Sequence, residues 1–173
     1  MGIESIPSES ECYPAKLAHG HISWLISKDV DFIFYPALFY ERNEFCDANN
    51  HYNCPIVTSY SENIKNNVEA IGRGEVVFKN PFMAFTSPEL IAQELIKEFT
   101  DISADEITAA VHAGWAEMDA VRHDMYKKGE EVIAYLEANN KRGIVLAGRP
   151  YHIDPEINHG IPELITSYDI AVL

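Results

Sequence analysis

Apolar residues fall into short continuous runs along this chain, and residues that favour turns bound most of the runs. The clearest runs cover residues 31–36, 55–60 and 143–148. Continuous rather than alternating apolarity is typical of parallel strands that are buried on both faces. Weaker runs at 75–78 and 169–173 extend the pattern, so we expect all of these segments to be strands of a parallel sheet.

Helical patterns alternate with these runs. Amphipathic stretches at about 13–28, 60–71, 88–99 and 155–167 are each flanked by a Pro, Ser or Asn that can start or cap a helix. Strands that alternate with helices form βαβ units. The sequence therefore predicts an α/β fold, with a Rossmann-like or flavodoxin-like parallel sheet flanked by helices.

A longer helical pattern interrupts this alternation between Ser103 and Asn139. Ser103 with Glu106 makes a capping box at its start, and Gly129 is a place where the helix could kink. Its apolar positions recur at helical spacing and are Ile107, Val111, Trp115, Met118, Val121, Met125, Val132 and Leu136. We expect this apolar stripe to be core, with a partner-facing groove as the alternative.

These patterns divide the chain into three parts. We expect a first α/β lobe over residues 1–102, a long linking helix over 103–140, and the first βαβ unit of a second lobe over 141–173. Domains seldom stop inside a buried strand, because its edge would stay unpaired. We therefore expect a piece of a longer polypeptide, whose residues 169–173 either pair with the first lobe's sheet or are covered by a second copy in a homodimer.

Composition narrows the classes of function. The chain has 173 residues, of which 47% are hydrophobic, and a mean hydropathy of −0.15, which is typical of a soluble globular domain. It lacks a signal peptide and any run of ~18 apolar residues, so we expect a cytoplasmic protein without membrane contact. The 13 basic and 27 acidic residues give a net charge of −14, which repels nucleic acid and suits docking to a basic protein face or simply solubility.

The strongest candidates for chemistry are cysteines. Cys12 stands just ahead of an amphipathic run with Pro14 in its first turn, and a helix start favours a metal-binding thiolate. Cys46 and Cys54 lie in a polar loop after the first expected strand. Ligands of open α/β sheets gather outside the carboxyl ends of strands. We therefore expect Cys12 and Cys54 to converge there, with Cys46 as a third ligand.

Thiolates select zinc or iron–sulfur centres. No pair of these cysteines has C-x-x-C spacing, so ordinary buried or loop cysteines stay an alternative. His19 and His21 are two residues apart on an expected helix and face different sides. Further candidates for contacts around a ligand are Glu9, Lys16, His19, His21, His51, Arg149 and His152.

Several longer motifs resemble one known family. They are Ile-Pro-Ser-Glu-Ser at 6–10, Cys-Tyr-Pro-Ala-Lys-Leu at 12–17, His-Gly-His at 19–21, Asp-Phe-Ile-Phe-Tyr-Pro at 31–36, the run at 50–60, Ile-Lys-Asn-Asn at 64–67 and the run at 148–161. Together they resemble the acyl-CoA dehydratase activase-related proteins. The domain of those proteins is similar to the cluster-bearing subunits of 2-hydroxyglutaryl-CoA dehydratase and benzoyl-CoA reductase.

The resemblance implies a 4Fe–4S or double-cubane cluster held by cysteines between two Rossmann-like lobes. An ATP-hydrolysing activase, often in the same polypeptide, would supply its electrons, and an acyl-CoA would be the substrate. Cys12 and Cys54 match family cysteines, whereas Ala37 stands where a third is common and Cys46 could substitute. We expect the cluster in the full-length protein, and neither cluster nor turnover in this chain alone.

Two other functions remain open from the sequence. One is a non-catalytic scaffolding or docking domain with vestigial cysteines, which the alanine at position 37 favours. The other is a structural zinc domain, whose ligands would be Cys12, Cys46, Cys54 and His51.

Overall fold

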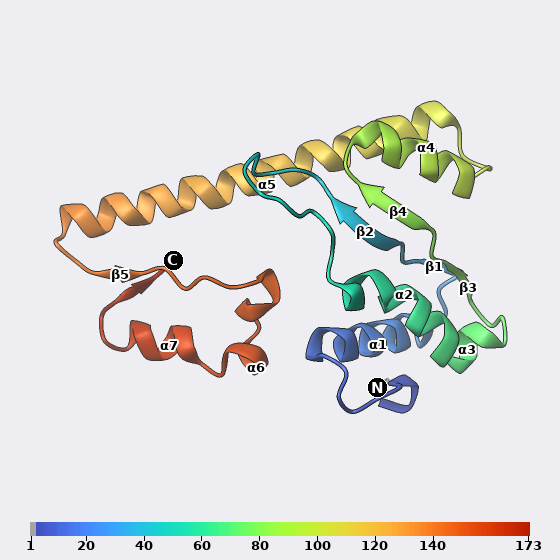
Figure 1. Ribbon diagram of the computed structural model, residues 1–173, viewed down its shortest axis with the longest axis horizontal. Coiled ribbons are helices and arrows are strands. Elements are labelled where there is room, and N and C mark those ends of the chain that lie inside the picture. Colours follow the sequence, from blue (N-terminus) through green and yellow to red (C-terminus); the bar gives the residue numbers. More distant parts are fainter. Residues whose placement is uncertain (1–2) are drawn as a thin grey trace. The chain divides into compact units, whose positions relative to one another are not determined.

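The computed structural model describes residues 3–173, in which helices and parallel strands alternate (Figure 1). The chain divides into two compact units, one up to Ala113 and one from Gly114 to Leu173. The boundary falls inside the long helix α5 (Ala104–Ala138).

The first unit contains most of the helices and strands. Its elements before α5 are η1 (Ile3–Ser5), α1 (Tyr13–Ile26), β1 (Phe32–Phe34), β2 (Ala37–Glu41), α2 (Pro55–Asn67), α3 (Glu69–Gly72), β3 (Val77–Lys79), β4 (Phe82–Phe85) and α4 (Pro88–Glu98). Helices α1 and α2 contact each other, and α4 contacts β4.

The four strands of this unit form two short parallel pairs that follow one another along the same direction. β1 pairs with β3, and β2 pairs with β4. The backbone hydrogen bonds continue between the halves, because Tyr35 N–H donates to the Lys79 carbonyl at 2.8 Å and Ala37 N–H donates to the Pro81 carbonyl at 2.9 Å. Pro36 and Pro81 have no N–H to donate, which explains why both strands are interrupted at matching places.

The hydrophobic core of the first unit lies where α1 and α2 meet the strands. Ile22 of α1, Ile33 of β1 and Ile64 of α2 are all at most 5% exposed and belong to one packed group, which Val68 and Val76 complete. Burial of one such side chain stabilises the fold by about 1.5–3 kcal/mol. This core holds α1 and α2 together, and the residues that precede these two helices carry two of the three cysteines.

Three of the expected helices are confirmed as α1, α4 and α5. The Ser87 hydroxyl accepts a hydrogen bond from Leu90 N–H at 3.3 Å at the start of α4, and the Ser103 hydroxyl accepts one from Glu106 N–H at 3.2 Å at the start of α5. Both serines are N-cap residues, and such a cap stabilises a helix by about 1 kcal/mol. α5 continues through Gly129 without a break.

The strand expected over 55–60 is wrong, because these residues form the first turns of α2. Cys54 precedes the helix and Pro55 takes its first position, where the fixed φ of proline suits a helix. A six-residue apolar run does not by itself distinguish a buried strand from a helix. The helix expected over 60–71 therefore starts earlier, and it divides at Val68 into α2 and α3.

The expectation that the apolar stripe of α5 is core is wrong for the middle of the helix. Ile107 and Leu136 are buried, but Met118, Val121 and Met125 are 42%, 51% and 70% exposed. Helical periodicity shows that a helix has an apolar face and does not show what covers that face.

The second unit contains, after the end of α5, a small parallel pair of strands. Its elements are β5 (Gly143–Ile144), η2 (Pro150–Ile153), α6 (Pro155–Asn158), α7 (Ile161–Thr166) and β6 (Ala171–Val172). β6 pairs in parallel with β5, so the expectation that residues 169–173 pair with the sheet of the first lobe is wrong. The helix expected over 155–167 is interrupted because His159 and Gly160 adopt φ of 54° and 74°.

The fold class is confirmed at the level of mixed helices and strands with parallel pairing. Each sheet within residues 3–173 has two strands, which is narrower than the wound sheet of a Rossmann-like or flavodoxin-like fold, so that finer prediction is not confirmed. No helix in this described range combines the length and apolarity needed to cross a bilayer.

Candidate functional site

Cys12 and Cys54 occupy equivalent places in the first unit. Cys12 is the N-cap residue of α1, with Pro14 in the first turn, and Cys54 is the N-cap residue of α2, with Pro55 in the first turn. Neither side chain makes a capping hydrogen bond to its own helix, and both residues are exposed. Each thiol therefore stands at a helix start whose backbone N–H groups favour negative charge.

Tyr60 of α2 connects the two cysteines. The side chains of Cys12 and Cys54 both lie close enough to its phenol to influence its ionisation, Cys12 more strongly than Cys54. Burial raises the pKa of Tyr60 far above its ordinary value, and Cys12, Tyr35 and Cys54, in that order, raise it further. Tyr60 therefore stays protonated at neutral pH and is a hydrogen-bond donor for a thiolate.

Cys54 is carried by a segment that runs back along β2. Asn53 N–H donates to the Phe39 carbonyl at 3.0 Å, and Glu41 N–H donates to the His51 carbonyl at 2.8 Å. The Asn53 side chain also donates to the Glu41 carboxylate at 2.7 Å. Cys54 thus starts α2 beside β2, and the backbone of His51 helps to anchor the segment that delivers it.

Cys46 lies in the exposed part of the same loop. Its thiol donates to the Asp47 carboxylate at 3.6 Å, and the neighbouring Phe45 is 64% exposed. Within residues 3–173, no group of three or more His, Cys, Asp or Glu side chains is arranged to hold a metal ion. The role of the three cysteines as metal ligands therefore stays a prediction.

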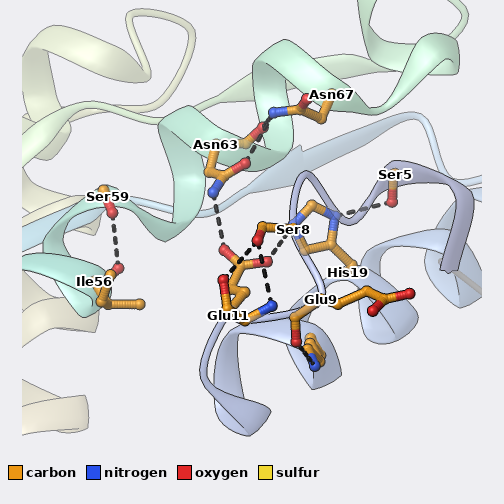
Figure 2. Close-up of polar contacts among 11 residues, drawn as sticks. Ser5, Ser8, Glu9, Glu11, His19, Ile56, Ser59, Asn63 and Asn67 are labelled. Carbon is orange, nitrogen blue, oxygen red and sulfur yellow. Dashed lines mark hydrogen bonds and ion pairs between the residues drawn. The ribbon is translucent and has the colours of Figure 1, made fainter.

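A buried polar network lies next to Cys12 in the first unit (Figure 2). One oxygen of the Glu11 carboxylate accepts a hydrogen bond from the Asn63 side chain at 2.9 Å, and the other lies 3.9 Å from Nε2 of His19. Nδ1 of His19 is 2.9 Å from the Ser5 hydroxyl. The His19 and Glu11 side chains are 2% and 8% exposed, so these contacts are shielded from water.

His19 is a neutral member of this network at neutral pH. Burial lowers the pKa of His19, and the Glu11 carboxylate opposes this effect only in part. His21, two residues further along α1, is exposed and faces a different side, as expected. His19 therefore acts as a hydrogen-bonding residue within the fold.

Glu9 and Lys16 add a contact to the same segment. The Lys16 ammonium donates to the backbone carbonyl of Glu9 at 2.5 Å. This bond folds the residues before α1 back against the first turns of the helix. Glu9, Lys16 and His19 thus hold the segment that leads into the first cysteine.

Arg149 and His152 belong to the second unit. Arg149 N–H donates to Nδ1 of His152 at 2.8 Å, and the His152 ring lies against Tyr151 with a centroid distance of 4.5 Å. A Cβ on Gly148 would lie 2.6 Å from Nδ1 of His152, so this close turn needs glycine. In this structure the two residues close a turn.

The sequence did not single out Tyr60, Glu11 or Asn63. Glu11 and Asn63 are 52 residues apart, and a contact over such a distance leaves no local pattern. The position of Glu11 directly before Cys12 is the one feature that could have drawn attention to it.

Comparisons with known proteins agree with the resemblance. The chain matches, over residues 1–173, the family model described as CoA enzyme activase uncharacterised domain, which confirms the predicted relation to acyl-CoA dehydratase activase-related proteins. Searches of curated proteins and of solved structures found no significant match.

Proposed function

Because this chain belongs to the family of CoA enzyme activase uncharacterised domains, we propose that it contributes thiolate ligands to an iron–sulfur centre. The proposed ligands are Cys12 and Cys54. The observation that carries the proposal is their placement, because the two cysteines start two packed helices and both act on the Tyr60 phenol. Iron–sulfur clusters are held by cysteine thiolates.

The residues present fit part of such a site. A 4Fe–4S cluster takes four cysteine thiolates, and this chain has three cysteines, of which two border Tyr60. We therefore assign two of the four ligands, Cys12 and Cys54, to this chain, with residues elsewhere in the full-length protein as the source of the other two. The chemistry that the centre would supply when bound is one-electron transfer, and the chain's own residues position two thiols for it.

The proposed partner is an ATP-hydrolysing activase in the same full-length polypeptide, with an acyl-CoA as substrate of the whole system. The family description supports an association with CoA enzyme activation. The net charge of −14 suits docking to a basic protein face.

A second candidate function is a docking domain with vestigial cysteines. It is supported by Ala37, which stands where the family commonly has cysteine and is 1% exposed in β2, near the segment that carries Cys54. The third candidate, structural zinc on Cys12, Cys46, Cys54 and His51, loses support because the described residues do not gather three such ligands. The variant Ala37→Cys separates the first two candidates: a vestigial site gains iron when this thiol is restored, whereas a half-site completed elsewhere binds iron without it.

The test of the proposed function is the iron and acid-labile sulfide content of the full-length protein after anaerobic purification. We expect iron and sulfide in equal amounts, together with visible charge-transfer absorbance. Full-length protein that contains neither, even after anaerobic reconstitution with ferrous iron and sulfide, would contradict the iron–sulfur proposal and favour the docking domain.

A further inference from the structure

We infer that Glu11 and Asn63 are positioning residues that fix the Cys12 thiol relative to α2, and thereby relative to Cys54. The inference deepens the proposed function and rests on it for the use to which the two thiols are put. Neither residue is itself a proposed ligand.

The bond between Glu11 and Asn63 joins the two cysteine-bearing parts of the first unit. Glu11 directly precedes Cys12, and Asn63 lies on α2 one turn after Tyr60. Their side chains meet at 2.9 Å across 52 residues of sequence, as Figure 2 shows. Any displacement of Glu11 relative to α2 displaces the neighbouring cysteine as well.

The orientation of the Asn63 side-chain amide is fixed by a hydrogen bond to its oxygen. Its side-chain oxygen accepts a hydrogen bond from the Asn67 side chain at 2.8 Å, one turn further along α2. With the oxygen occupied in this way, the amide N–H groups point toward the Glu11 carboxylate (Figure 2). The donor is therefore oriented before Glu11 meets it.

Burial makes this bond costly to break. The Glu11 side chain is 8% exposed, and a hydrogen bond to a charged group contributes roughly twice what a neutral one does. Removal of the Asn63 amide leaves the buried Glu11 carboxylate without this donor. The bond therefore resists the opening of α1 from α2 at the end where the thiols lie.

Two other contacts hold the same segment without reaching α2. Ser5 meets His19 at 2.9 Å, and Lys16 meets the Glu9 carbonyl at 2.5 Å, and both contacts join the segment to α1. The Glu11–Asn63 bond is the one of these three that reaches α2. The spacing of the two cysteines accordingly depends on this bond in particular.

Phenylarsine oxide tests the inference, because tight binding of this trivalent arsenical needs two thiols side by side. The arsenical is titrated into the intact wild-type protein and into the variants Glu11→Ala, Asn63→Ala and Glu11→Gln. Peptide mapping then identifies the two cysteines that it bridges. Thermal unfolding of each variant, recorded in parallel, shows whether the variant is folded. The matched control is Glu62→Ala, which removes a 2.6 Å bond between α2 and Asn80 that does not involve the cysteine segment.

We expect Glu11→Ala and Asn63→Ala each to weaken bridging of Cys12 and Cys54 about tenfold, with no further loss in the double variant. Glu11→Gln keeps an acceptor oxygen for Asn63 but loses the charge, so it should bridge more tightly than Glu11→Ala and less tightly than the wild type, and Glu62→Ala should have no effect. Folded Glu11→Ala protein that binds the arsenical as tightly as wild type, or equal weakening by Glu62→Ala, would overturn the inference.

The outcomes also separate this inference from the proposed function. A wild-type protein that bridges the arsenical with the expected dependence on Glu11 but binds no iron or sulfide supports the positioning role and contradicts the iron–sulfur role. A protein that assembles a cluster and bridges the arsenical equally well without Glu11 supports the iron–sulfur role and contradicts the positioning role. Failure of the wild type to bridge at Cys12 and Cys54 contradicts the positioning role.

Discussion

Cys12 and Cys46 are both exposed thiols in the first unit, yet their surroundings differ. The segment before Cys12 is tied by buried contacts to α1 and α2, through His19 and Glu11. Cys46 has an exposed carboxylate as its neighbour, at 3.6 Å. The comparison shows that exposure of a cysteine does not define a site, because a ligand needs a thiol whose position is held by the fold.

The largest expected effect is the loss of iron when single cysteines are replaced, either at the two helix starts or in the exposed loop. Cys12→Ser or Cys54→Ser in the full-length protein should abolish iron and sulfide binding, because each removes one of two paired ligands. Cys46→Ser is the matched change in the exposed loop and should retain most of the iron. Equal loss in all three variants would place Cys46 in the same ligand set.

A second way to sharpen the comparison is to weaken the packing beneath each region. Ile64→Ala empties a side chain that is 0% exposed in the core shared by α1 and α2, and we expect it to lower the free energy of unfolding by about 2–5 kcal/mol. Phe45→Ala, beside Cys46, removes a side chain that is 64% exposed and should change stability by less than about 0.5 kcal/mol. Urea denaturation measures both, and equal costs would contradict the difference in anchoring.

The polar anchor of the loop gives a smaller effect. Asn53→Ala removes side-chain bonds of 3.0 Å to the Leu38 carbonyl and 2.7 Å to Glu41, and we expect a loss of about 1–3 kcal/mol in unfolding free energy. The backbone bonds of this segment remain, so the loop should loosen without unfolding of the unit. Amide hydrogen exchange should show faster exchange near Cys54 and unchanged exchange in α4, and a global increase would contradict a local anchor.

The pH dependence of stability is the smallest expected effect. Burial lowers the pKa of His19 from its ordinary 6.5, so the unfolded chain binds a proton at higher pH than the folded protein does. The contribution of neutral His19 is therefore complete above pH 6.5 and is lost as the pH falls through the lower folded-state value. The difference in unfolding free energy between wild type and His19→Gln should shrink over this range, and a difference that grows on acidification would contradict the sign.

The parts of the fold that could be predicted have local signals. α4 and α5 combine an amphipathic pattern with a serine cap at Ser87 and Ser103, and these features act over one or two turns. The start of α2 was mistaken for a strand because its short apolar run fits both structures. The short strands β2 and β4, which follow Pro36 and Pro81, were also missed, since a proline reads as the end of a strand.

In the candidate site, too, some features have a local signal in the sequence and others do not. Cys12 was recognisable because Pro14 and an amphipathic run mark the helix that it precedes. Its contact with Tyr60, and the bond between Glu11 and Asn63, depend on the packing of α1 against α2. Such packing arises from the whole core and is not encoded near any of these residues.

The pairing of Cys12 with Cys54 is the central claim, and its most direct measurement is cross-linking of the intact, reduced protein with dibromobimane, a short reagent that joins two thiols. Digestion and peptide mapping then identify which cysteines are joined. We predict that the main product joins Cys12 to Cys54 and that Cys46 is modified singly. A product in which Cys46 is joined to either of the others, or single modification of all three cysteines, would contradict the account.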